Sequence, residues 1–141
     1  MEKINVGRWI LGGIIAGVVA DVLGTLVDSV LLAEWWTNGM KALGHSGFSL
    51  NQWIGFNVLG LITGIVAIWI YAGIRPRFGP GPMTAIYAGL AVWVVGTLVP
   101  NLSFMVFGGL FSKHLAMYTT LGGVVEIVVG TVAGAALYKE A

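Results

Sequence analysis

Four long apolar stretches dominate the chain and constrain its fold more than any other feature. A helix needs about 20 predominantly apolar residues to cross the roughly 30 Å hydrocarbon core of a bilayer, and each stretch reaches that length. The sequence therefore predicts an all-α membrane protein with four transmembrane helices in a single domain, residues 1–141. The predicted spans are residues 6–32, 52–74, 83–107 and 115–138.

The composition agrees with a lipid environment and excludes several functional classes. Only 9% of the residues are charged and 57% are hydrophobic, which leaves too few polar side chains to cover a soluble domain. The net charge of +1 offers no basic surface for nucleic acid. Because the chain has no cysteine, a disulfide framework, a thiolate metal site and a cysteine nucleophile are excluded.

Local signals mark the ends of the spans. The first apolar stretch is too long for the core of a signal peptide, so we expect an ordinary membrane span. Ser49 and Gln52 have the spacing of a capping box at the start of the second span. The prolines and glycines of residues 79–82 break the chain before the third span. Pro100 lies inside the third span and is expected to kink it.

The distribution of lysine and arginine predicts that both termini are cytoplasmic. Basic residues are enriched in cytoplasmic loops, and five of the seven fall on the side of the termini. These five are Lys3, Arg8, Arg75, Arg77 and Lys139, against Lys41 and Lys113 on the other side. The loop Arg75-Pro76-Arg77 is then short and cytoplasmic, whereas residues 34–51 form a longer external loop.

The external loop carries large apolar side chains among polar ones. These are Trp35, Trp36, Phe48 and Leu50. Tryptophan is enriched at membrane interfaces, so the loop is expected to lie along the bilayer surface. A loop that binds a partner protein is the alternative.

Two segments of the chain resemble each other and suggest a tandem repeat of two-helix hairpins. Residues 17–28 align with residues 89–100, and both contain Gly-Thr-Leu-Val. Residues 58–64 align with residues 128–134 in the spans that follow. Helices one and three run in the same direction, so the halves would be parallel repeats about an axis normal to the membrane. Chance similarity is the alternative, because glycine, valine and leucine are so common here.

Small residues recur at helical spacing in every span. Glycines four positions apart allow helix backbones to approach closely in lipid, so they predict a tight bundle or an oligomer. The glycines predicted to pack against other helices are Gly13, Gly17, Gly24, Gly60, Gly64, Gly89, Gly96, Gly123, Gly130 and Gly134.

Carboxylates at membrane depth are the main functional candidates. Asp21 and Glu126 are expected near the bilayer midplane, with Asp28, Asn57 and Asn101 in the outer halves of their spans. No lysine or arginine lies deep in a span, and an ionised carboxylate there costs at least about 2.5 kcal/mol. Both midplane acids must therefore be protonated, share a proton, bind a cation or face water. They either join helices as neutral hydrogen-bonding groups, or they lie at the bottom of an outward-facing polar cavity that is lined by Asp28, Asn57 and Asn101.

Other chemistry has less support. His45 and His114 are weak candidates for metal ligands, because both are isolated in loops, and no metal or cofactor is predicted. Trp93 is expected to fill the core. The glycine-rich stretches lie inside apolar helices rather than at strand-to-helix turns, so no nucleotide-binding loop and no enzymatic activity is predicted.

The segment Arg75-Pro-Arg-Phe-Gly-Pro-Gly-Pro82, the following residues 84–90 and Pro100-Asn101 resemble a family of small bacterial four-span membrane proteins of unassigned function. The resemblance implies a location in the bacterial inner membrane and carries over no site residue.

The sequence thus favours a non-enzymatic membrane protein that binds or passes a proton, a cation or a small polar solute at its acids. The alternative is an accessory subunit of a respiratory or photosynthetic complex that docks through its glycine-rich faces. The expected partners are the lipid bilayer and either further copies of the chain or other membrane subunits.

Overall fold

The computed structural model describes residues 4–140 and consists of helices joined by short turns. The first span combines α1 (Val6–Leu26) with the π-helical segment η1 (Val27–Leu31), and the short helix α2 (Ala33–Ala42) follows it. The second span is α3 (Leu50–Phe78). The third contains α4 (Pro82–Trp93), the π-helical η2 (Val94–Leu98) and α5 (Val99–Val106), and the fourth is α6 (Lys113–Ala135).

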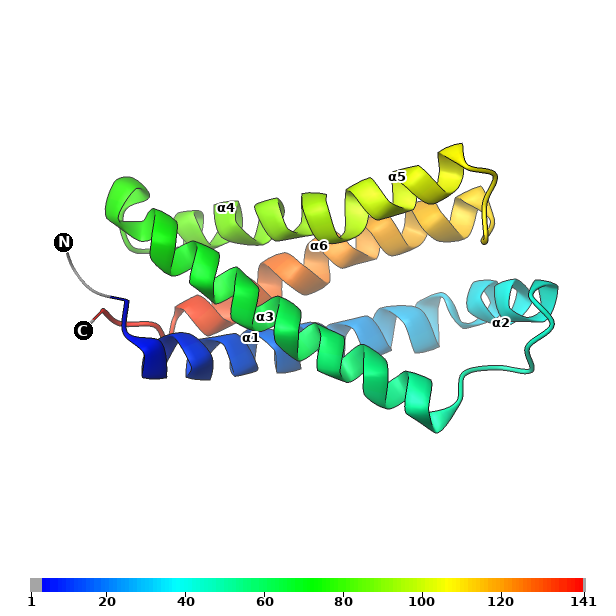
Figure 1. Cartoon of the computed structure of the whole chain (residues 1–141), viewed down its shortest axis with the longest axis horizontal. Helices are drawn as coiled ribbons and strands as arrows, with labels where there is room; N and C mark the ends of the chain where they lie inside the picture. Colours follow the sequence, from blue (N-terminus) through cyan, green and yellow to red (C-terminus); the bar gives the residue numbers. More distant parts are fainter. Residues whose placement is uncertain (1–3, 141) are drawn as a thin grey trace.

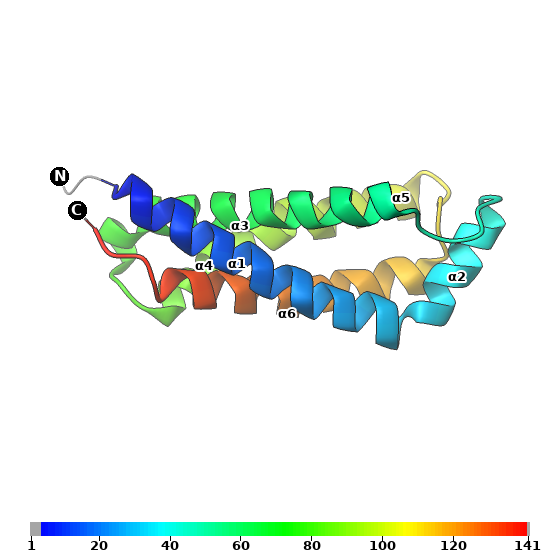
Figure 2. The same cartoon turned by 90° about the horizontal axis from the view of Figure 1, so that it is seen from below.

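The four spans form an elongated antiparallel bundle (Figures 1 and 2). The start of α1 and the end of α6 lie at one end of the bundle together with the turn between α3 and α4, and we call this the terminal end. Helix α2 and the turn between α5 and α6 lie at the opposite, far end. All four helices are long and apolar enough to cross a membrane, which confirms the predicted fold class. Lys3 lies outside the described residues, and the orientation in the membrane stays a prediction.

Serine side chains cap the starts of α3 and α6, and the sequence predicts the first of these caps. The backbone N–H of Gln52 donates to Ser49 Oγ over 3.3 Å, and the Ser49 N–H donates to Gln52 Oε1 over 2.8 Å. This is the predicted capping box, and it satisfies two backbone donors at the start of α3. Ser112 caps α6 by accepting from the N–H of Leu115 over 3.2 Å.

The predicted cytoplasmic loop is shorter than expected. Helix α3 continues through Pro76 to Phe78, so Arg75 and Arg77 lie in its last turns instead of in a loop. The proline costs one hydrogen bond close to the helix end, where few further turns depend on it. The N–H of Gly79 closes the last turn onto the Arg75 carbonyl over 2.8 Å. Gly79 and Gly81 have φ angles of 84° and 136°, which favour glycine, and the chain reverses there.

Pro100 disturbs the third span by widening the helix. The π-helical segment η2 immediately precedes α5, and Pro100 is the second residue of α5. A proline ring clashes with the carbonyl four residues earlier, and a wider turn at that point relieves the clash. The predicted disturbance is therefore present as a π-helical segment.

Helix α1 is the central element, because its most extensive contacts are with α3 on one side and α6 on the other. Against α3, a Cβ atom at Gly17 would lie 2.6 Å from the Cα of Leu61, and one at Gly13 would lie 2.5 Å from the Cα of Ile65. A Cβ atom at Gly64 would overlap the backbone of Gly13 and Gly17. The two backbones are thus in direct contact, as short side chains permit.

The contact between α1 and α6 uses the same principle. A Cβ atom at Gly130 would lie 2.5 Å from the carbonyl oxygen of Ala16, and one at Gly134 would overlap the carbonyl oxygen of Gly12. Between α4 and α6, a Cβ atom at Gly89 would lie 3.0 Å from the Cα of Val128. Gly96 differs from the other predicted packing glycines, since no described residue from another helix lies within 4 Å of the position of its missing Cβ atom.

The two aligned halves of the chain pair their helices in a similar register. Gly17 contacts Leu61, and the aligned residues Gly89 and Thr131 also contact each other. The π-helical segments do not coincide in the alignment, because η1 and η2 fall at different aligned positions. The duplication therefore stays a prediction.

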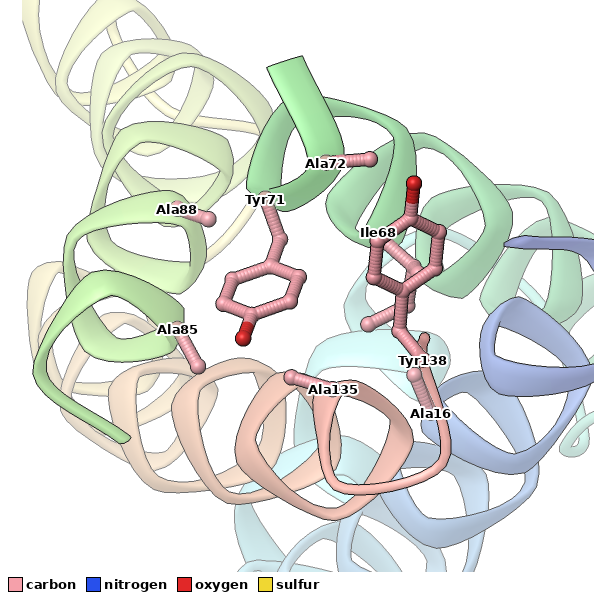
Figure 3. Packing of buried hydrophobic residues seen from close by; sticks show 8 residues of the cluster. All are labelled: Ala16, Ile68, Tyr71, Ala72, Ala85, Ala88, Ala135 and Tyr138. Carbon is pink, nitrogen blue, oxygen red and sulfur yellow. The ribbon is translucent and has the colours of Figure 1, made fainter. Parts of the chain in front are cut away.

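The main cluster of buried hydrophobic residues lies in the terminal half of the bundle (Figure 3). Tyr71 points from α3 toward α4 and α6, and its ring meets that of Tyr138 edge-on at 5.9 Å. Arg75 lies over the ring of Tyr138 and forms an ion pair with Glu140 over 2.7 Å. The buried cluster comprises Ala16, Ile68, Tyr71, Ala72, Ala85, Ala88, Ala135 and Tyr138. Alanines bring the helices close together, and the large rings fill the remaining space.

The substitution Gly64→Ala should destabilise the bundle by about 1–3 kcal/mol, because the added methyl group overlaps the backbone of α1. Gly73→Ala is a matched control in the same helix, where a Cβ atom meets nothing within 4 Å. There alanine should be neutral or stabilising by up to about 1 kcal/mol, because it favours helix formation. The measurement is the temperature at which purified protein in dodecyl maltoside loses its monodisperse gel-filtration peak. An equal decrease of this temperature in both variants would contradict the role of the close contact between Gly64 and α1.

Candidate functional site

A cavity of about 430 Å³ lies toward the far end of the bundle. Its walls are formed by α1 with η1, by α2 and the loop after it, by α3 and by α6. Asp21, Asp28, Asn57 and Glu126 all line it. The structure thus brings four of the five predicted site residues to one space.

The carboxylate of Asp21 occupies a position next to the backbone of α3. A side chain at Gly60 would overlap this carboxylate, so the absence of a side chain at residue 60 makes room for the acid. Gly60 was predicted as a helix-packing residue, and it does contact α1 through its carbonyl oxygen, near Gly17. Its more specific effect is to admit a polar group between two apolar helices.

Glu126 reaches from α6 toward α1. A Cβ atom at Gly24 would lie 3.2 Å from Oε2 of Glu126, and one at Gly122 would lie 3.2 Å from Oε1. Gly24 lies between Asp21 and Asp28 on the first span, within one turn of each. The Glu126 carboxylate is therefore held over the same stretch of α1 and η1 that carries the two aspartates.

Asp28 is connected to α2 by a hydrogen bond. The indole N–H of Trp36 on α2 donates to Asp28 Oδ1 over 3.0 Å. Trp36 lines the cavity, and its ring meets Phe48 and Phe111 edge-on at 5.6 and 5.3 Å. The sequence interpretation of Trp36 as an interfacial anchor missed this contact, because spacing alone does not reveal which way a loop folds back.

The two asparagines have different roles. Asn57 lies on the wall of the cavity and donates to the carbonyl of Trp53 in its own helix over 2.8 Å. The prediction that Asn101 lines the same cavity is wrong. Its amide donates to Thr120 Oγ1 over 2.7 Å and to Thr119 Oγ1 over 3.3 Å, which joins α5 to α6. Both hydroxyls already donate to backbone carbonyls within α6, so each has a free lone pair to offer to a partner amide.

The histidines and Trp93 lie apart from the acids. The His114 ring is 5.6 Å from that of Trp35, and His45 is exposed. Within residues 4–140, no group of three or more histidine, aspartate or glutamate side chains is arranged to hold a metal ion. Trp93 packs between α4 and α6, where its indole N–H donates to the Thr120 carbonyl over 2.9 Å.

The electrostatic character of the cavity follows from its lining. The described residues around it include three carboxylates and neither lysine nor arginine. Hydroxyl and amide groups of Thr25, Ser29, Asn57 and Thr63 add further polar atoms. When its carboxylates are ionised, such a site attracts positive charge and disfavours anions.

The substitution Asn101→Leu should lower the stability of the bundle, because it removes a polar link between α5 and α6 while leaving the cavity lining intact. Such bonds contribute about 0.6–1.7 kcal/mol inside membranes. Asn57→Leu is the matched control, since its amide bonds only within its own helix and should affect stability less. The temperature at which the gel-filtration peak is lost measures the stability of both variants. A larger loss of stability in Asn57→Leu than in Asn101→Leu would contradict the role of Asn101 as a link between α5 and α6.

Comparisons with known proteins yield no relative for this chain: no protein-family model, no curated protein and no solved structure gives a significant match.

Proposed function

We propose that the cavity binds a cation at Asp21, Asp28 and Glu126, and that this binding serves the passage of a proton, a cation or a small polar solute through the membrane. The observation that carries the proposal is the convergence of all three acids on one cavity whose described lining holds no basic side chain. The proposed function is non-enzymatic.

The energetics of buried charge support this proposal. An ionised carboxylate at membrane depth costs at least about 2.5 kcal/mol, so three acids in one apolar bundle require compensation. Asp28 receives one hydrogen bond, from Trp36, whereas Asp21 and Glu126 accept none from residues 4–140. A proton or a bound cation would neutralise these groups, and exchange between the two would couple cation binding to proton release.

The position of the cavity supports access from one side. The acids lie between the middle and the far end of the bundle, whereas the terminal half is filled by the cluster around Ile68 and Tyr71. In the proposed orientation the termini are cytoplasmic, so the cavity would open to the outside of a bacterial inner membrane. Passage through the membrane would then require the terminal half to separate transiently, whereas binding alone would not.

A role as an accessory subunit has less support. The alternative needs glycine-rich faces that are free to dock, yet Gly17 and Gly130 contact helices of the same chain. Gly96 has space beside it and lies next to Val95, whose side chain is exposed. A contact with another copy or another membrane subunit would therefore use the face of η2, and such a contact is compatible with cation binding.

The flux through the variants Asp21→Asn and Glu126→Gln should be at least about ten-fold lower than through wild type. Neither amide can release a proton or neutralise the charge of a cation. Glu34→Gln is the matched control, since Glu34 is an exposed acid on α2 outside the cavity lining. Proteoliposomes containing the dye pyranine report internal pH. Proton entry is driven by a potassium gradient with valinomycin, and cation exchange by gradients of sodium or benzyltrimethylammonium.

Each variant must keep its gel-filtration profile for the comparison to count. Wild-type flux no greater than in empty liposomes would exclude the passage. Equal flux in wild type, Asp21→Asn and Glu126→Gln would exclude these acids as its site.

A further inference from the structure

We infer that the ligand of the cavity is a hydrophobic organic cation, a substituted ammonium ion with an apolar body, and not a bare inorganic ion. This inference rests on the proposed cation-binding function and names the chemical class that the site would accept. It is carried by the size of the cavity, the aromatic side chains in its wall and the spacing of its acids.

The cavity is too large for a bare ion. A volume of about 430 Å³ falls within the range of about 300–1,000 Å³ that is typical of small-molecule sites. One water molecule takes about 30 Å³ of liquid, so an inorganic cation would leave most of this space to water. An organic molecule with several carbon atoms would fill it.

Aromatic rings form a continuous row along one wall. Trp36 of α2 meets Phe48 of the following loop at 5.6 Å, and Phe48 meets Phe56 of α3 at 5.7 Å. All three line the cavity, as does Trp53. Aromatic faces attract substituted ammonium groups through cation–π interactions and also accommodate their apolar substituents.

The row is fixed on the side of the acids. The hydrogen bond from Trp36 to Asp28 places the first ring beside a carboxylate, and Trp36 also contacts Phe111 in the turn between α5 and α6. A ligand that lies along the rings can thus direct its charged group toward the acids. This pairing of aromatic wall and carboxylate resembles no inorganic ion site, in which oxygen atoms surround the ion.

The acids are also not grouped as the ligands of a metal ion would be. Asp21 is directed against Gly60 of α3, whereas Glu126 is directed against Gly24 of α1. The described residues contain no cluster that could hold a metal ion, although three carboxylates line the same cavity. Separate carboxylates suit a ligand whose positive charge is spread over a larger group.

Two sources could supply a substituted ammonium group: a free amine or the headgroup of a phospholipid such as phosphatidylethanolamine. We commit to the free cation, because the wall beside the acids is formed by rigid rings that suit a compact apolar body.

The experiment measures the fluorescence anisotropy of ethidium, a permanent organic cation, bound to the purified full chain in dodecyl maltoside without added lipid. Benzyltrimethylammonium, tetramethylammonium and sodium then compete with it. Benzyltrimethylammonium should displace ethidium at a concentration at least about ten-fold lower than tetramethylammonium does, because it adds an apolar ring to the same charge. Sodium should displace it least.

Variants test the two halves of the site separately. Phe56→Leu keeps an apolar side chain but removes the ring, and it should weaken benzyltrimethylammonium binding by about 3- to 30-fold. Phe107→Leu is the matched control, since Phe107 is 88% exposed and lies outside the cavity lining. Glu126→Gln should weaken binding of every cation, and all variants are first checked by gel filtration.

Each outcome decides between the two proposals. If sodium competes as well as benzyltrimethylammonium and Phe56→Leu binds like wild type, the site is an inorganic cation site, and only this inference falls. If phosphatidylethanolamine displaces ethidium while phosphatidylglycerol and benzyltrimethylammonium do not, the ligand is a lipid headgroup and the free cation is excluded. If ethidium does not bind at all, only this inference falls, because the liposome flux still tests the site for protons and inorganic cations. If ethidium binds but Glu126→Gln changes neither its binding nor the flux, the proposed function falls as well.

Discussion

The direct backbone contact of α1 with α3 and α6 is the interaction on which the rest of the bundle depends. Lipid removes the hydrophobic driving force for helix association, so the helices must gain stability from close packing. Gly13 and Gly17 bring α3 against one side of α1, and Gly130 and Gly134 bring α6 against the other. Because these contacts concentrate in the terminal two thirds of α1, the elements diverge beyond them and leave room for a cavity.

The division of the bundle into a dense half and an open half follows from residue size. Alanines such as Ala85 and Ala88 are fully buried and let the helices pack around Tyr71. Toward the far end, carboxylates, aromatic rings and small residues line the space between the elements and leave about 430 Å³ unfilled. The π-helical segment η1 lies in the open half and carries Asp28, so a local irregularity of the helix coincides with the candidate site. Irregular helical turns of this kind are often found at functional sites.

Much of the fold could be predicted from the sequence, because its signals are local. Span length and capping depend on neighbouring residues, and the boundaries at Ser49 and Pro82 agree with the structure. The acids could be identified as exceptional because polar groups in lipid are expensive. The partner of each acid could not be predicted, since it depends on how helices rotate against one another. Asn101 illustrates the limit: its depth matched the other polar residues, but it faces Thr119 and Thr120.

Residue 60 of α3 and residue 21 of α1 share one space, so the sizes of their side chains depend on each other. The carboxylate of Asp21 fills the volume that a side chain at residue 60 would otherwise take. An enlargement at one position is therefore tolerated only with a reduction at the other, such as alanine or serine in place of the acid. In a set of homologous sequences, residues 21 and 60 would then vary together, and an acid at the first would occur with glycine at the second. The pair forms a signature by which relatives that retain the acidic cavity could be separated from those that share only the bundle.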